Sequence, residues 1–140
     1  MPYWRLIYHI IWGTKNRERL ITPEIERDLY GYLRGKAFAM NCSLHAINGV
    51  ADHIHLAISI PPALAVARAV GRLKGASAHY LNQKYPMGVY FAWQRFYSVL
   101  SISEKDLAFV VGYINRQKQR HAANLLEQQF EALQPMRPGP

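Results

Sequence analysis

The sequence predicts an α+β domain of the ferredoxin-like split βαβ class, in which two helices cover one face of a four-stranded antiparallel sheet. Strand-like apolar segments and amphipathic helical segments follow one another in the order β-α-β-β-α-β, and one further helix comes last. The 140 residues suit one domain with a modest core, and 50% of them are hydrophobic. Because neither a linker nor an internal repeat divides the sequence, we expect one domain over residues 1–130 and a flexible tail over residues 131–140.

The first strand and the first helix are indicated by their composition and by their end signals. Residues 5–12, RLIYHIIW, are rich in β-branched and aromatic side chains, which is typical of a buried strand. Residues 22–41 predict a helix with Thr22 as its N-cap and Pro23 as its first residue. The apolar stripe that would pack on the sheet consists of Ile25, Leu29, Leu33 and Phe38.

The middle of the chain predicts a hairpin followed by the second helix. Residues 43–50 and 53–60 are strand-like, and the segment NGVAD at 48–52 supplies the turn residues of a tight connection. Two prolines end the second of these strands, and residues 63–85 then predict a helix. The basic side chains of this helix that we expect to remain in solvent are Arg68, Arg72 and Lys74.

The last part of the chain predicts a fourth strand and a long final helix. The strand lies around residues 97–102, and Ser103 then caps a helix that runs to about Phe130. Glu104 and Asp106 in the first turn of this helix would complement its dipole. The apolar surface of the helix consists of Leu107, Val110, Val111, Ile114 and Leu125.

Two histidines stand at alternate positions in the strand-like segment ADHIHLAISI. Because side chains alternate along a strand, His53 and His55 share one face with small neighbours, and the opposite face is wholly aliphatic. We expect the aliphatic face to meet the helices and the histidine face to be open. The imidazole pair is a compact site for a divalent cation, or for a phosphate when protonated. The alternative is that both rings simply hydrogen-bond at the sheet surface.

The final helix offers further polar candidates. Tyr113 and Gln117 are four residues apart and therefore share a face, and Arg120 and His121 follow one turn later. A polar face is unusual for a helix that only packs, although Tyr113 could be an amphipathic boundary residue. Together with the two histidines, this set combines a nucleophile, metal ligands and basic surroundings.

The composition indicates the class of binding partner and the cellular compartment. Lys and Arg number 17 against 9 Asp and Glu, and the resulting net charge of +8 favours a polyanionic partner such as nucleic acid or a membrane surface. Cys42 is the one cysteine, so no intramolecular disulfide can form, and a reducing cytosol is the simplest setting. No segment approaches the length of a membrane span. We therefore expect a cytoplasmic protein.

Five segments of the chain resemble, in order and spacing, the small single-tyrosine transposases of the HUH class, which belong to bacterial and archaeal insertion sequences that move as single-stranded DNA. The segments are YHIIW, DHIHLAI, LKGASAHYLN, WQRFYSVLSIS and YINRQKQRH. No single motif suffices, but five motifs in register over residues 3–125 are specific. The resemblance implies a metal-dependent transposase that acts at DNA in a prokaryotic cytoplasm. Such an enzyme recognises hairpin ends and cleaves and rejoins single-stranded DNA through a 5′-phosphotyrosine.

The resemblance also implies roles for individual residues. It implies Tyr113 as the nucleophile, and His53, His55 and Gln117 as ligands of Mg²⁺ or Mn²⁺. It implies a homodimer whose subunits exchange the final helix, so that each tyrosine serves the histidines of the other subunit. Basic residues expected near DNA, each of which could equally be a solvated surface charge, are Lys15, Arg17, Arg68, Arg72, Lys74, Arg116, Lys118 and Arg120.

The sequence departs from the family pattern before the final helix. Glycines usually follow the Trp-Gln pair in this family, whereas Phe96 and Ser98 stand at those positions here. Glycines would ease the motion of the tyrosine helix, so the departure bears on full transposition more than on cleavage.

Three other interpretations stay open at the level of sequence. An RNA-recognition domain has the same topology, but it places stacking aromatics rather than histidines at positions such as 53 and 55. A small metal-dependent hydrolase would need further histidines or carboxylates near this pair. A domesticated relative would bind structured single-stranded DNA or RNA without mobilising an element.

Overall fold

Four antiparallel strands form the sheet at the centre of the computed structural model, which describes residues 4–123. β1 (Ile7–Gly13) and β3 (His53–Ser59) occupy the two central positions. β2 (Ser43–Val50) lies beside β3 at one edge, and β4 (Ser98–Ile102) lies beside β1 at the other. The order β2-β3-β1-β4 is the predicted ferredoxin-like arrangement.

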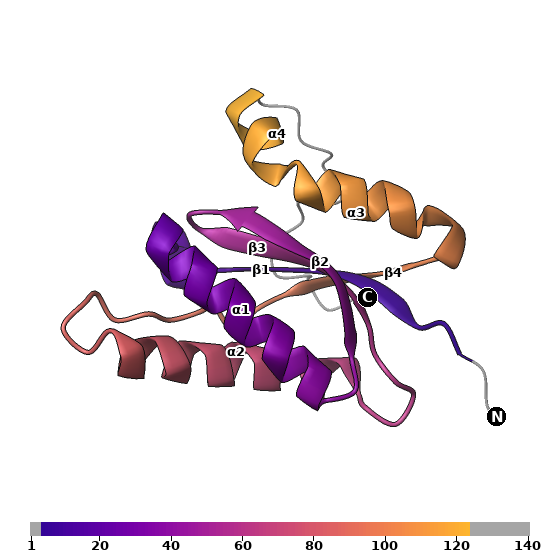
Figure 1. Ribbon diagram of the computed structural model, residues 1–140, viewed down its shortest axis with the longest axis horizontal. Helices are drawn as coiled ribbons and strands as arrows, with labels where there is room; N and C mark the ends of the chain where they lie inside the picture. Colours follow the sequence, from indigo (N-terminus) through magenta and orange to yellow (C-terminus); the bar gives the residue numbers. More distant parts are fainter. Residues whose placement is uncertain (1–3, 124–140) are drawn as a thin grey trace, which may run out of the picture.

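The helices are divided between the two faces of this sheet (Figure 1). α1 (Pro23–Ala39) and α2 (Val66–Lys84) cover one face and contact each other, as the sequence predicts. α3 (Leu107–Asn115) and α4 (Gln117–Ala123) lie over the opposite face. None of the helices within residues 4–123 has both the length and the apolar character that crossing a bilayer requires.

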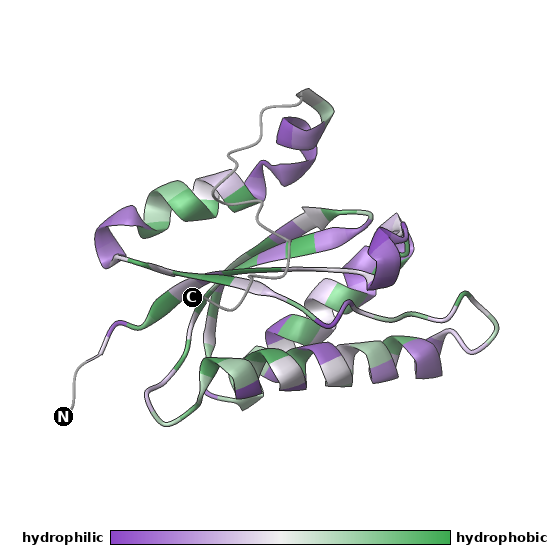
Figure 2. Ribbon diagram, turned by 180° about the vertical axis from the view of Figure 1, so that it is seen from behind, coloured by the Kyte–Doolittle hydropathy of each residue, from purple (hydrophilic) through white to green (hydrophobic). Residues whose placement is uncertain are grey.

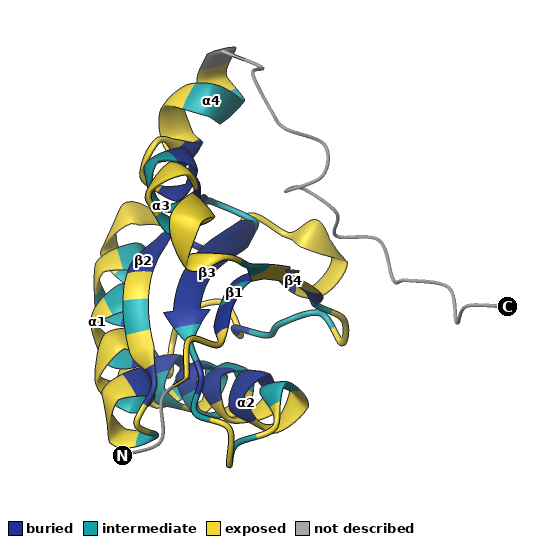
Figure 3. Ribbon diagram, turned by 90° about the vertical axis from the view of Figure 1, so that its right-hand side faces the viewer, coloured by how far each residue is buried: buried dark blue, intermediate teal, exposed yellow. Residues whose placement is uncertain are grey.

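The main core lies between the sheet and the pair α1 and α2, and Figure 3 shows the buried residues along the central strands and on the inner side of α2. The sheet contributes to this core from the face that we call the aliphatic face, although one of its side chains is a tryptophan. Its buried side chains are Ile10, Trp12, Ile47, Ile54, Leu56 and Ile58. The helices contribute Leu29, Leu33, Val70, Leu73 and Leu81. Burying one such side chain stabilises the fold by about 1.5–3 kcal/mol, so this layer supplies most of the apolar stabilisation.

α1 begins as predicted and differs in one packing residue. Thr22 Oγ1 accepts a hydrogen bond from the backbone N–H of Ile25, and Pro23 is the first helical residue. The predicted packing of Phe38 is wrong, because its side chain is 82% exposed and Ala37 is buried instead. Successive residues of a helix are turned by about 100°, so Phe38 faces away from the sheet that Ala37 contacts.

α2 differs from the prediction in its start and in one basic side chain. The helix begins at Val66 rather than at residue 63, after a turn that follows the two prolines. Lys74 is half-buried rather than solvated, and its Nζ donates to the backbone carbonyls of Gln94 at 2.5 Å and Phe96 at 3.3 Å. Burial lowers the pKa of this amine. Lys74 therefore ties the loop that precedes β4 to α2.

The hairpin of β2 and β3 turns at residues 51–52, whereas Asn48 and Gly49 lie within the paired part of β2. A Cβ at Gly49 would lie 2.1 Å from the backbone oxygen of His53, so the ladder accepts only glycine there. Asn48 pairs with His55 and thus places an amide on the histidine side of the sheet. The segment NGVAD was correctly predicted to connect two strands, but only its last two residues form the turn.

The predicted final helix is broken into two helices. A 3-10 turn capped by Ser103 leads into α3, and Arg116 then leaves helical geometry with φ −103° and ψ 17° before α4 begins. Figure 2 shows that α3 is largely hydrophobic and that α4 is largely hydrophilic. The predicted extension to Phe130 lies outside the described residues.

Candidate active site

Three histidines lie on the side of the sheet opposite to the aliphatic face, and we call this side the histidine face. His53 and His55 project from β3, as the alternation of strand side chains predicts, and His9 projects from the neighbouring β1. His9 is the diagonal neighbour of His55 across the β1–β3 ladder, and its Nε2 lies 2.9 Å from His55 Nδ1.

The histidine face is covered, so the expectation that it is open is wrong. His53 and His55 are only 1% and 0% exposed. The small side chains that suggested an open face make room for α3 instead. They allow a second, smaller core between this helix and the sheet, formed by Ala46, Ala57, Val110, Tyr113 and Ile114.

Tyr113 projects from α3 onto the middle of the histidine face. Its ring centroid lies 6.1 Å from that of His55 and 6.4 Å from that of His9, and both contacts are edge-on. The guanidinium carbon of Arg120 lies 4.7 Å from the centre of the same ring, which is a cation–π contact. The tyrosine is completely buried. The predicted nucleophile and the predicted metal-binding pair are therefore neighbours within one chain.

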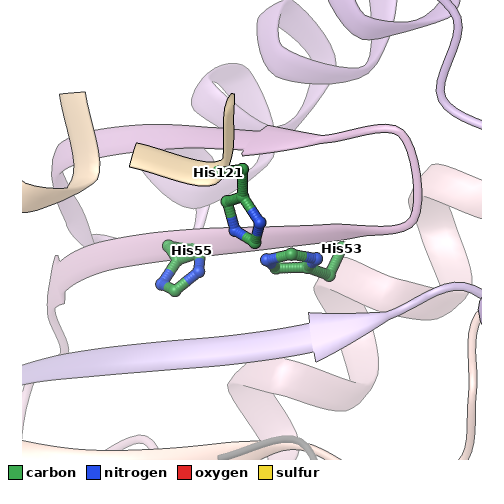
Figure 4. Close-up of side chains that lie close together, drawn as sticks. All are labelled: His53, His55 and His121. Atoms are coloured by element: carbon green, nitrogen blue, oxygen red, sulfur yellow. The ribbon is translucent and has the colours of Figure 1, made fainter. Parts of the chain in front are cut away.

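The break at Arg116 is followed by α4, whose first turn lies over the same histidines. Gln117 is buried, and its Oε1 lies 3.1 Å from His121 Nε2. The His121 ring lies 4.8 Å from that of His53, centroid to centroid. Figure 4 shows the rings of His53, His55 and His121 turned toward one another, and one nitrogen from each ring lies within 4.8 Å of the other two.

Neighbouring polar groups orient the rings of β3. Asp52 Oδ1 lies 2.8 Å from His53 Nδ1, and Arg17 Nη2 lies 3.3 Å from both of these atoms. Burial alone would raise the pKa of Asp52, but hydrogen bonds from His53 and Arg17 outweigh it and lower that pKa to about 2. Asp52 is therefore a carboxylate at neutral pH. An ionised carboxylate that accepts the N–H of an imidazole is the usual support of a metal-binding histidine.

A second set of contacts fixes the joint between α3 and α4. Asn48 Nδ2 donates to the backbone carbonyl of Asn115 at 3.1 Å, and Asn48 Oδ1 accepts from Lys118 Nζ at 2.7 Å. Lys118 also donates to the carbonyl of Gly49 and forms an ion pair with Glu26 at 2.6 Å. β2 and α1 thereby hold the start of α4 over the histidine face.

The basic residues predicted near DNA do not form one cluster. Those on the histidine side, in the turn after β1 and around α4, are Lys15, Arg17, Arg116, Lys118 and Arg120. Those on α2, across the sheet from the histidines, are Arg68, Arg72 and Lys74. Two residues of the first group already form ion pairs within the protein. Arg17 contacts Asp52, and Lys118 contacts Glu26.

Two residues of the site were not assigned from the sequence. His9 lies inside an apolar strand, and only the register between β1 and β3 places it beside His55. His121 was noted on the final helix but was given no role. The spacing of four residues that joins Tyr113 to Gln117 continues to His121, and this spacing is the signal that could have identified it.

The chemistry of these donors fits a divalent cation. Three imidazoles converge, and the amide oxygen of Gln117 lies beside them. His53 is held through Nδ1 by Asp52, and His55 is held through Nδ1 by His9. Rings fixed in this way by outer hydrogen bonds are typical of metal ligands, and imidazole suits several divalent transition metals.

Comparison with known sequences identifies related proteins. A family model described as "Transposase IS200 like" matches residues 2–117. The ISDra2 transposase TnpA of Deinococcus radiodurans is 31% identical over 119 residues, which are 81% of this chain and 85% of that protein. The transposase of the insertion sequence element IS200 from Salmonella typhimurium is 32% identical over 82 residues, which are 59% of this chain and 54% of that protein.

Comparison with solved structures gives the same architecture. A crystal structure described as that of a transposase from Deinococcus radiodurans has a TM-score of 0.67 and 30% identity, and the match covers 83% of this chain and 93% of that one. A REP-associated tyrosine transposase bound to a REP hairpin has a TM-score of 0.66 over 86% of this chain and 72% of that one. The second structure is only 15% identical and therefore supports the fold alone.

Proposed function

The chain belongs to the family of IS200-like transposases, which are DNA-processing enzymes, and on this premise we propose that it cleaves and rejoins single-stranded DNA by transesterification at Tyr113. The observation that carries this proposal is the position of the Tyr113 ring, which lies 6.1 Å from that of His55 on a face with three histidines. A tyrosine beside a potential metal site is an arrangement suited to nucleophilic attack on a phosphodiester.

The proposed reaction exchanges one phosphate ester for another. The hydroxyl oxygen of Tyr113 bonds to the phosphorus and loses its proton, while the bond from phosphorus to the 3′ oxygen breaks and that oxygen takes up a proton. The products are a 5′-phosphotyrosine and a free 3′-hydroxyl. Because the covalent link conserves the ester, a 3′-hydroxyl can reverse the step and rejoin DNA without ATP.

We assign His53, His55 and Gln117 to hold Mg²⁺ or Mn²⁺ beside this tyrosine. When bound, such a cation supplies Lewis-acid polarisation of a non-bridging phosphate oxygen. Asp52 and His9 keep the two imidazoles of β3 in place through their Nδ1 atoms. Arg120, stacked on the tyrosine ring, adds a positive charge close to where the phosphate would bind.

A phosphodiester can reach Tyr113 only when α3 moves, because the tyrosine side chain is completely buried between that helix and the sheet. This motion would break the packing of the smaller core. β2 and β3 contribute only the short side chains of Ala46 and Ala57 to that core. Few apolar contacts hold α3 compared with α1 and α2, so its release costs less than loss of the main core.

We further propose a homodimer in which the helices that follow β4 are exchanged, as the family resemblance implies. An exchanged helix would make the same contacts with the partner's sheet that α3 makes here with its own. The exchange would move Tyr113 from the histidines of its own subunit to those of the partner. Sedimentation equilibrium tests the dimer, and a monomer at micromolar concentration would contradict it.

The proposed substrate is single-stranded DNA that contains a hairpin. The net charge of +8 favours a polyanion, and the exposed arginines of α2 and of the α3–α4 joint are available for phosphate contacts. Several such contacts give an affinity that falls linearly with the logarithm of salt concentration. An affinity that does not depend on salt concentration, or a preference for blunt duplex DNA, would contradict this assignment.

Incubation with single-stranded DNA from the ends of the element and Mn²⁺, followed by a denaturing gel, is the direct test. The proposal predicts a covalent protein–DNA adduct that requires both the metal and Tyr113. Hairpin binding without an adduct would instead support a domesticated relative that no longer cleaves.

A mixed dimer tests the exchange. One subunit carries Tyr113→Phe and the other carries His53→Ala. With exchanged helices, the intact tyrosine of one subunit meets the intact histidines of the other, and one site works. Without exchange, each site lacks one component and no adduct forms.

A further inference from the structure

We propose that His121 is a further protein ligand of the metal, so that the centre contains three imidazoles together with the amide of Gln117. This inference rests on the proposed function, because it concerns the same site. It assigns a role to a residue of α4 for which the family resemblance implies none.

The first support is the convergence of the rings. His53 and His55 come from β3, whereas His121 lies 66 residues beyond His55, yet the His121 and His53 rings lie 4.8 Å apart, centroid to centroid (Figure 4). One nitrogen from each of the three rings lies within 4.8 Å of the others. A tetrahedral metal with bonds of about 2.1 Å separates its ligand atoms by roughly 3.4 Å. Small side-chain rotations would therefore bring all three nitrogens into range.

The second support is that every ring is held by a different neighbour. Asp52 contacts Nδ1 of His53, His9 contacts Nδ1 of His55, and Gln117 contacts Nε2 of His121. Each neighbour engages one of the two ring nitrogens, which orients the ring. A carbonyl oxygen has two lone pairs, so Gln117 Oε1 can accept from His121 and still face a metal.

This ligand set has a consequence for metal choice. Imidazole nitrogen binds transition metals more readily than Mg²⁺, which prefers oxygen ligands. A centre with three imidazoles and one amide oxygen should therefore favour Mn²⁺, Co²⁺ or Zn²⁺ over Mg²⁺. Loss of His121 should reduce this preference, because one nitrogen is then replaced by water.

The experiment measures metal binding to the chelator-treated full-length protein. Isothermal titration with Zn²⁺ and visible absorption with Co²⁺ are compared for the wild type, His53→Ala, His121→Ala and His121→Gln. His79→Ala is the matched control, because His79 is exposed on α2, across the sheet from the site. Thermal melting in the presence of chelator verifies that the metal-free variants remain folded.

We expect His121→Ala to weaken Zn²⁺ binding at least tenfold and to change the Co²⁺ spectrum, with the His79 variant unchanged. If His53→Ala weakens binding but His121→Ala does not, His121 is not a ligand and the proposed function stands. Weaker binding by His121→Ala with an unaltered Co²⁺ spectrum would make His121 a positioning residue and would overturn the inference. If His53→Ala leaves binding intact, the proposed metal site itself fails.

Discussion

The two sides of β3 are both buried, but they are buried against different partners. On the aliphatic face, Ile54, Leu56 and Ile58 pack against α1 and α2. On the histidine face, His53 and His55 lie under α3 and α4. One strand therefore contributes to a large apolar core on one side and to a polar cluster under a smaller core on the other.

The difference separates what stabilises the fold from what performs the chemistry. Removing aliphatic side chains from water is favourable without further conditions. Removing an imidazole from water is unfavourable unless hydrogen bonds or a metal replace the lost hydration. The layer formed by α3 and α4 therefore contributes less stability for the same burial, and under the proposed function it is the layer that moves to admit DNA.

The largest expected effect is on the histidine face. Tyr113→Phe removes one oxygen, so it should abolish the covalent DNA adduct completely. The ring can still pack on Ala57 and Ile114, so the melting temperature should change little. A denaturing gel measures the adduct, and a filter-binding assay should show that hairpin affinity is kept. An adduct found by mass spectrometry on another tyrosine would refute the assignment.

The next effect is on the aliphatic face and should be one of stability alone. Leu56 is completely buried between the sheet and the helices, so Leu56→Ala should lower the free energy of unfolding by about 2–5 kcal/mol. Metal affinity of the remaining folded protein should not change. Phe38→Ala is the control, because a surface substitution usually changes stability by less than about 0.5 kcal/mol. Urea unfolding measures both variants, and equal losses would mean that burial on the aliphatic face does not decide the stability of the fold.

The fold was largely predictable because its determinants are local and periodic. Alternation along residues 53–59 identified the aliphatic face, and the cap at Thr22 located the start of α1. The β-α-β-β-α-β order then left few possible topologies. The break at Arg116 was not predictable, because no proline or glycine stands there and contacts of Asn48 with Asn115 and of Lys118 with β2 hold the joint.

For the site, the sequence predicted which residues take part but not how they are arranged. The His-x-His spacing and the Tyr113 motif singled out these residues, and the structure brings them together. The cover over the histidine face was missed, because small side chains on a strand face can mean an open surface or a closely packed helix. His9 was missed because strand register depends on contacts between segments that are distant in sequence.

A smaller effect should follow from changing the support of a ligand. His9 contacts His55 Nδ1, so His9→Leu should weaken metal affinity by about 10–100-fold while leaving Tyr113 in place. His9→Gln should restore part of the affinity, because its amide can reach the position of the imidazole Nε2. Calorimetric titration distinguishes the two variants. Equal affinities for His9→Leu and wild type would mean that His9 only fills space.

The smallest effect should come from a polar contact in the layer of α1 and α2. Tyr85 donates a hydrogen bond to Asp28, and Lys84 forms an ion pair with the same carboxylate at 3.0 Å. These contacts lower the pKa of Asp28, and the hydrogen bond with Asp28 raises the pKa of Tyr85 to about 12. Because the pKa of Asp28 is lower in the folded than in the unfolded protein, its contribution to stability is present above the unfolded value of about 3.9.

This contribution should disappear as the pH falls through the lowered pKa of Asp28, because the carboxylate is then protonated in both states. Asp28→Asn should therefore be slightly less stable than wild type at pH 7 and at pH 5, and the two should converge in strong acid. Urea unfolding at these pH values measures the difference, and Tyr85→Phe with the double variant separates the hydrogen bond from the ion pair. Metal binding should be the same in all four proteins, since the sheet lies between this contact and the histidines. A change in metal affinity would show that the two faces of the sheet are coupled, and the separation of stability from chemistry would then be wrong.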